Sequence, residues 1–166
     1  KDITFEEKGY AKINLALHVT GFRQDGYHVL DSVVVFTDIF DRLFINQRGE
    51  NGLTFSGEFS RSLNVKKNSI SQALKLFESG LTNRFSVHVE KNLPIGGGLG
   101  GGSADAGAMI RFITNYFKLP MPSPKSISKI GADVPACILS VASRVGGIGE
   151  YVKPIDISGI DLWLVL

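Results

Sequence analysis

The glycine-rich segment Leu93–Asp105 combines residue types and a spacing that suit the binding of an anion. Six of the seven residues from Gly96 to Gly102 are glycine. Backbone without side chains can approach a ligand closely, and the start of a helix offers free N–H groups and the positive end of its dipole. A flexible linker is the alternative interpretation, but this segment joins two apolar patterns directly, and six glycines are costly to order. We therefore expect a loop that holds a phosphate group.

The order of residues within the segment can be compared with the patterns of two familiar phosphate-binding loops. The Walker pattern requires a lysine before its Ser or Thr, whereas Ser103 directly follows Gly102. The dinucleotide pattern G-x-G-x-x-G is present, but it predicts an acidic residue about 20 positions later. Residues 111–132 hold no Asp or Glu. A nucleotide-dependent oxidoreductase therefore remains an alternative that rests on three glycines alone, and tight binding of NADH would favour it.

Regular patterns on both sides of the glycine segment predict the elements that must position it. Residues 85–90 alternate apolar and polar side chains, which is typical of a half-buried strand. Residues 104–117 place apolar side chains at helical spacing, so the segment is predicted to connect a strand to a helix. Residues 10–21 also alternate and predict a strand. One face of that strand would carry Ile13, Leu15, Leu17 and Val19, and the other Lys12, Asn14, Ala16, His18 and Thr20.

The remaining patterns complete a mixed α/β chain. A helix is expected to begin after Asn68 or Ser69 and to end at Gly80, and Ser123 is expected to cap a short helix that continues to Ile130. The expected strands span 32–38, 42–47, 53–56 and 162–166, and the expected loops and turns span 21–26, 51–52, 120–124, 131–135 and 146–149. Because the chain ends inside an apolar strand pattern, we expect it to be a fragment.

Composition limits the classes of protein to which the chain can belong. The 166 residues are enough for one domain with a real core, and a hydrophobic content of 43% is typical of a globular protein. No apolar run approaches the roughly 20 residues of a membrane helix. One cysteine fits the reducing cytoplasm. A formal net charge of +2 gives no reason to expect nucleic acid, so an RNA-binding module is disfavoured. The oligomeric state stays open.

Three separated segments, taken together, resemble a known family. They are Ala11–Leu15 followed by Asp25–His28, then Leu93–Ser103, then Gly131–Pro135 followed by Gly149-Glu150. In this order they closely resemble the GHMP kinase superfamily and, within it, the kinases of the non-mevalonate isoprenoid pathway. The resemblance implies an ATP-dependent kinase that phosphorylates the 2-hydroxyl of 4-diphosphocytidyl-2-C-methyl-D-erythritol. Another GHMP-type small-molecule kinase is the alternative.

The resemblance also implies a fold and its extent. Residues 1–166 would form the N-terminal ATP-binding domain, an α/β (α+β) unit with the two-layer fold that resembles a ribosomal protein. The C-terminal domain would be absent, with its start near residues 160–166. In the family that second domain supplies an aromatic partner for the cytosine ring. We therefore expect residues 1–166 alone to be slow or inactive, and the apolar strand at 162–166 to promote aggregation.

The resemblance assigns roles to individual residues. Lys12 and Asp133 would be the catalytic pair, because a lysine can neutralise charge on the transferred phosphate and an aspartate can accept the proton of the alcohol. Asn14, Tyr27 and His28 would bind the substrate. Magnesium is expected with ATP, without a dedicated protein site. The family usually has Ser-Ser where this chain has Ser103-Ala104, so one contact to phosphate or metal would be missing. The expected ATP-binding residues are Pro94, Ile95, Gly96, Gly97, Gly98, Leu99, Gly100, Gly101, Gly102, Ser103 and Ala104.

Overall fold

Two long antiparallel strands form the frame of the fold in the computed structural model, which describes residues 4–46, 52–60, 63, 68–81, 85–159 and 161. Strand β1 (Thr4–Phe22) pairs along its length with β2 (His28–Asn46). On the other edge of β2, β4 (Ser86–Glu90) pairs near one end and β5 (Ser143–Gly147) near the other. Strand β3 (Gly52–Ser56) runs parallel to β4, and β6 (Tyr151–Pro154) runs antiparallel to β5.

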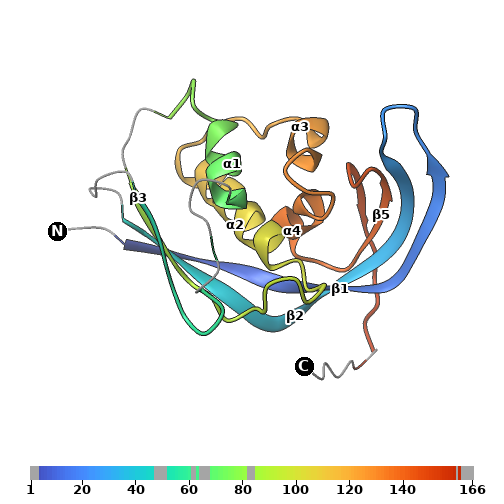
Figure 1. The fold of residues 1–166 in the computed structure, drawn as a ribbon, viewed down its shortest axis with the longest axis horizontal. Helices are drawn as coiled ribbons and strands as arrows, with labels where there is room; N and C mark the ends of the chain where they lie inside the picture. The colour runs from blue at the N-terminus through green and yellow to red at the C-terminus, as the bar shows by residue number, and fades with distance from the viewer. Residues whose placement is uncertain are drawn as a thin grey trace.

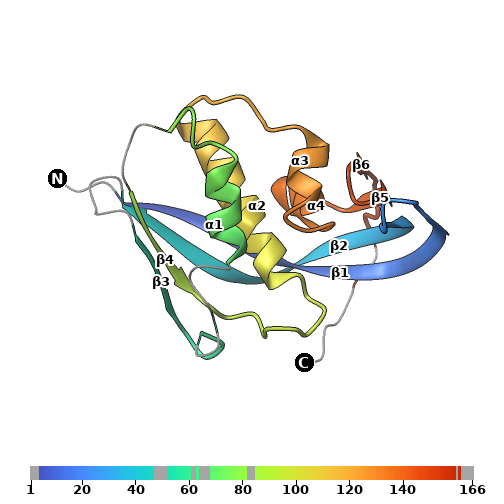
Figure 2. The ribbon, with the colours of Figure 1, turned by 45° about the horizontal axis from the view of Figure 1, so that its top comes forward.

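The described helices all cover the same face of this sheet, so the fold has two layers (Figure 1). Helix α2 (Gly101–Tyr116) lies between α1 (Ser69–Lys75) and α4 (Val134–Leu139), with α3 (Pro124–Ser128) beyond α4 (Figure 2). This arrangement confirms the predicted α+β class with two layers. Among the described residues no helix is long and apolar enough to cross a membrane.

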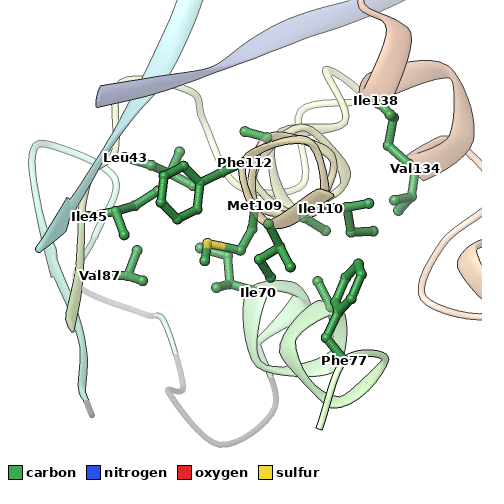
Figure 3. Packing of buried hydrophobic residues seen from close by; sticks show 14 of the residues in the cluster. Leu43, Ile45, Ile70, Phe77, Val87, Met109, Ile110, Phe112, Val134 and Ile138 are labelled. Atoms are coloured by element: carbon green, nitrogen blue, oxygen red, sulfur yellow. The ribbon is translucent and has the colours of Figure 1, made fainter. Parts of the chain in front are cut away.

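The main core fills the space between the helices and the β2–β4 part of the sheet. Leu43, Ile45 and Val87 of the sheet face Met109 and Phe112 of α2, as Figure 3 shows. Apart from Phe112, which is 5% exposed, none of these side chains is more than 2% exposed. Burial of each such side chain stabilises the fold by about 1.5–3 kcal/mol. The packing fixes α2 over the sheet, and α2 begins where the glycine segment ends.

Several expected boundaries shift in the structure. The strands predicted at 32–38 and 42–47 are one continuous strand, β2. Helix α2 begins at Gly101, three residues before the predicted start, and α4 begins at Val134, inside the predicted loop. The strand expected at 162–166 lies outside the described residues.

The prediction that four apolar residues share one face of β1 is wrong beyond Asn14. The β1–β2 register shifts there, because Asn14 pairs with Val34 but Ala16 pairs with Val33. Such a bulge inserts one residue and moves every following side chain to the other face. As a result, Leu17 and Val19 follow the face of Asn14, and they are 54% and 60% exposed.

Candidate active site

Three segments that are far apart in the sequence meet at Lys12. The backbone N–H of Lys12 donates to the carbonyl of Leu99 at 2.8 Å, which aligns the glycine segment with β1. The Lys12 Nζ lies 2.9 Å from Asp133 Oδ2 and donates to Asn14 Oδ1 at 2.6 Å. Lys12 is only 5% exposed. A buried ammonium group needs such partners, because an unpaired charge in the interior is strongly unfavourable.

Asp133 is free to reach Lys12 because it does not cap its own helix. It occupies the N-cap position of α4, yet its side chain makes no capping hydrogen bond. Its carboxylate is 34% exposed, so it faces both Lys12 and solvent. On its N-terminal side, Ala132 packs directly against Gly149, where an added Cβ would lie 2.0 Å from the Ala132 carbonyl oxygen. The β5–β6 turn therefore holds the loop that carries Asp133.

Gly100 joins the glycine segment to the Lys12–Asp133 pair. It is the N-cap of α2 and has a left-handed backbone with φ 68°, which favours glycine. An added Cβ would lie 3.3 Å from Lys12 Cε and 3.7 Å from Asp133 Oδ2. The first turn of α2 has neither an acidic residue nor a side-chain cap. Its free N–H groups are therefore suited to bind an anion, and they lie a few ångströms from the pair.

A pocket of about 370 Å³ opens above the glycine segment. Ser69 at the start of α1 forms part of its wall, and a Cβ on Gly102 would meet the Ser69 Oγ at 3.0 Å. Ala104, expected to bind ATP, does not line the pocket: its side chain is buried and its N–H donates to the Gly100 carbonyl within the helix. The other expected ATP-binding residues do line it: Pro94, Ile95, Gly96, Gly97, Gly98, Leu99, Gly100, Gly101, Gly102 and Ser103.

A buried ionic triad, Asp41–Lys91–Asp105, lies beneath the pocket. The Lys91 Nζ donates to a carboxylate oxygen of Asp41 and to Asp105 Oδ2 at 2.7 Å. The second oxygen of Asp41 accepts from the backbone N–H groups of Asn92 at 2.6 Å and Leu93 at 2.9 Å. Asp41 and Lys91 therefore fix the chain that enters the glycine segment, and Asp105 fixes the helix that leaves it. The triad joins both ends of the loop.

The triad changes the titration of its own members. Burial, followed by the charge of Asp41, raises the pKa of Asp105 from 3.8 to about 7, although Lys91 opposes the shift. Asp105 Oδ1 has no hydrogen-bond partner within the described residues, so Lys91, at the other oxygen, is the side chain that stabilises the ionised form. Burial alone would lower the pKa of the Lys91 ammonium group, but the charges of Asp105 and Asp41 outweigh that effect and raise its pKa.

We expect this titration to appear in the stability of the protein. Between pH 4 and pH 7 the folded protein binds a proton at Asp105 that the unfolded chain, with its ordinary pKa of 3.8, releases. The contribution of Asp105 to the free energy of unfolding therefore falls as pH rises through this range and is constant above it. Urea unfolding at pH 5, 6, 7 and 8 would measure it.

Asp105→Asn removes this dependence. The unfolding free energy of the variant minus that of the wild type should therefore increase as pH rises to about 7. Asp156→Asn is the matched control, because Asp156 is an exposed carboxylate outside the pocket that accepts from Ser158 N. A constant difference between Asp105→Asn and wild type across the four pH values would contradict the assignment.

The three expected substrate residues are not all in one place. Asn14 is in direct contact with Lys12, and its Nδ2 donates to Ser32 Oγ at 2.8 Å. Tyr27 and His28 lie at the tip of the β1–β2 hairpin, where the His28 ring packs edge-on to Phe22 with centroids 5.1 Å apart. Along the hairpin between the two groups, the exposed Leu17 and Val19 lie on the face that carries Asn14, which we call the inner face. Within the described ranges, no three His, Cys, Asp or Glu side chains cluster to hold a metal ion.

Sequence patterns did not reveal Asp41 or Lys91. Asp41 fell between two predicted strands, and Lys91 followed a predicted strand directly, where a lysine is ordinarily exposed. The one available signal was the position of Lys91 at the entry of the glycine segment, with Asp105 at its exit. That pairing requires the loop to fold back on itself, as it does here.

Comparison with known proteins finds one matching family and several similar kinases. Residues 68–147 match the family described as GHMP kinases N terminal domain. The 4-diphosphocytidyl-2-C-methyl-D-erythritol kinase of Cereibacter sphaeroides is 40% identical over 156 residues, which cover 94% of this chain and 55% of the relative. The protein of the same name from Dinoroseobacter shibae is 43% identical over 145 residues, covering 87% of this chain and 49% of the relative.

A solved structure agrees with these relatives. The crystal structure of 4-(cytidine 5'-diphospho)-2C-methyl-D-erythritol kinase superposes with a TM-score of 0.70 and 31% sequence identity, covering 91% of this chain and 55% of that one. The chain thus spans about half the length of the curated relatives it matches. The family match, the relatives and the solved structure agree that this chain has the fold of the N-terminal domain of GHMP kinases.

Proposed function

We propose that this chain is the ATP-binding part of a kinase that phosphorylates the 2-hydroxyl of 4-diphosphocytidyl-2-C-methyl-D-erythritol. One observation carries the proposal: the Lys12–Asp133 ion pair lies against Gly100, at the start of the helix whose free N–H groups face the pocket. A cation, a carboxylate and an anion site within a few ångströms are the parts that phosphoryl transfer to an alcohol needs.

The proposed reaction assigns each part a step. The phosphates of ATP bind over the glycine segment and the first turn of α2. Asp133, one third exposed, accepts the proton of the substrate hydroxyl as that oxygen attacks the γ-phosphorus. The bond from the γ-phosphorus to the oxygen that bridges it to the β-phosphate breaks, and ADP leaves. Lys12 holds the Asp133 carboxylate in place by pairing with it, and it neutralises charge that develops on the transferred phosphoryl group. Magnesium, held mainly by the phosphate oxygens of the nucleotide, would supply further charge neutralisation.

The substrate would lie along the inner face of the β1–β2 hairpin. That face begins at Asn14, beside Lys12, and continues through Leu17 and Val19 toward the tip. The exposed apolar side chains offer contact area to a ligand, and Tyr27 offers a ring for stacking on a pyrimidine. His28 carries a donor and an acceptor for the edge of the base. A cytoplasmic location follows from the same proposal, since ATP and a soluble metabolite are its substrates.

Nucleotide binding provides the direct test of the glycine segment. We expect Gly98→Ala to weaken ATP binding by about tenfold or more, because the new methyl group lies on the loop where phosphate must approach bare backbone. Isothermal titration with ATP and magnesium would measure the affinity. Gly159→Ala is the matched control: both glycines have positive φ, 74° and 85°, and both have open space around an added Cβ.

Equal ATP affinities in the two variants would contradict the placement of the nucleotide. The assignment of the phosphoryl acceptor is tested separately, by coupled ADP release with the cytidine substrate against other small alcohols in the full-length protein. Preference for a different alcohol would leave a GHMP-type kinase but reassign its substrate.

A further inference from the structure

Arg111 connects the three elements that carry the candidate active site. It lies on α2, and its Nε and Nη2 donate to Glu7 Oε2 of β1 at 3.1 and 2.9 Å. Nη2 also donates to the carbonyl of Lys8 at 2.8 Å. On its other side, Nη1 donates to the carbonyl of Ile138 in α4 at 3.2 Å, with Cys137 O at 3.4 Å. One guanidinium group therefore links α2, β1 and α4.

Each linked element supplies one part of the site. Helix α2 begins at the glycine segment, β1 carries Lys12 four residues after Lys8, and α4 carries Asp133 at its N-cap. Arg111 contacts the opposite end of α4, where the last carbonyl groups have no partner within the helix. Since α4 is only six residues long, about 9 Å at 1.5 Å per residue, a displacement at its C-terminal end moves Asp133 as well.

The packing around Arg111 leaves α4 little freedom to take another position. Gly107, one helical turn before Arg111, touches α4 directly: an added Cβ would lie 2.8 Å from the carbonyl carbon of Cys137. Arg111 and Glu7 are each 23% exposed, so their ion pair is partly screened from water. A planar guanidinium with five donors can serve the carboxylate and the two sets of carbonyls at once, which a lysine cannot do.

We propose that Arg111 is a positioning residue, which sets the distance between Lys12 and Asp133 by holding α4 against β1. This inference rests on the proposed kinase function for its catalytic consequence, but the Lys12–Asp133 contact can be measured without any reaction. Displacing a catalytic group by about 1 Å can lower a rate by about 100-fold. The glycine segment is not contacted by Arg111, so nucleotide affinity should be largely independent of it.

The experiment compares Arg111→Ala and Arg111→Lys in the full-length protein. We expect Arg111→Ala to lower kcat by roughly 10- to 100-fold while the affinity for ATP stays within about twofold. Guanidinium chloride at millimolar concentration should restore part of kcat in this variant and none in the wild type, because Arg111 borders an open cavity of about 560 Å³ beside Glu7 and Ser140. Arg111→Lys should be impaired and should not respond to guanidinium.

Arg144→Ala is the matched control, since Arg144 forms a bidentate pair with Asp31 that joins β5 to β2 without touching α4. A further measurement needs no catalysis, namely the ¹³C NMR chemical shift of the Asp133 carboxyl carbon. Lys12→Met should change this shift clearly when Arg111 is present and much less in the Arg111→Ala background. An unchanged kcat and an unchanged carboxyl response in folded Arg111→Ala would overturn the inference. If the wild type transfers no phosphate but the carboxyl response is lost, the kinase proposal fails and the positioning role stands.

Should Arg111→Ala not fold, Glu7→Gln provides the second variant, because it removes the charge that orients the guanidinium and keeps the contacts to α4. It should lower kcat by a smaller factor than Arg111→Lys. An unchanged kcat and an unchanged Asp133 carboxyl response in both folded variants would overturn the inference.

Discussion

Asp133→Asn is expected to lower kcat by roughly 10²- to 10⁴-fold, the usual contribution of a general base, with ATP affinity changed by no more than about twofold. The amide oxygen of asparagine cannot accept the proton of an alcohol at neutral pH. The residue keeps its shape at the start of α4, where the aspartate makes no capping bond that the substitution could break. The variant also removes the ion pair with Lys12, so Lys12 loses one of its two side-chain partners.

Steady-state assays of ADP release by the full-length protein, together with calorimetric titration of ATP, would separate the two effects. Asp156→Asn serves as the matched control, because it removes the same charge from an exposed carboxylate outside the site. If Asp133→Asn retained kcat within about threefold of wild type, another group would take the proton, or the alcohol would need no base. The proposed role of Asp133 would then be withdrawn, while the anion site at α2 would be unaffected.

The convergence of Lys12, the glycine segment and Asp133 could be anticipated from the resemblance to the GHMP kinases, because each part lies in a motif that matches the family. Such motifs are local, and a glycine run between a strand and a helix has few interpretations. The start of α2 was harder to place. Gly101 and Gly102 are poor helix formers, which moved the predicted start to Ala104, but packing of the helix against the sheet overrides this local preference.

The features that were not predicted depend on contacts between distant residues. Lys91 meets Asp41 across 50 residues and Asp105 across 14, and in the sequence alone each of the three has the residue type of an ordinary exposed charge. The bulge after Asn14 inserts a single residue, which strict alternation does not reveal, yet it transfers Leu17 and Val19 to the other face. The role of Arg111 likewise could not be predicted from the sequence, because it depends on contacts with both β1 and α4.

Lys91→Met is expected to lower the free energy of unfolding by about 3–5 kcal/mol at pH 8, the usual effect of removing one partner from a buried ion pair. Methionine is similar in length to lysine but leaves Asp41 and Asp105 buried without a cation. The loss should be smaller near pH 5, because Asp105, with a pKa raised to about 7, is then protonated. Urea unfolding at both pH values would measure the effect.

Two further variants distinguish loss of charge balance from loss of packing. Lys153→Met makes the same substitution at an exposed site on β6 and should change the unfolding free energy by no more than about 0.5 kcal/mol. Adding Asp105→Asn to Lys91→Met should recover more of the lost stability at pH 8 than at pH 5, since the cost of burying Asp105, ionised or protonated, grows as pH rises above its ordinary pKa. If Lys91→Met were as stable as wild type at pH 8, the triad would not be what holds the two ends of the glycine segment together. The loop would then owe its shape to Leu93 and Leu99, which pack with Ala11 in a separate apolar cluster beside it.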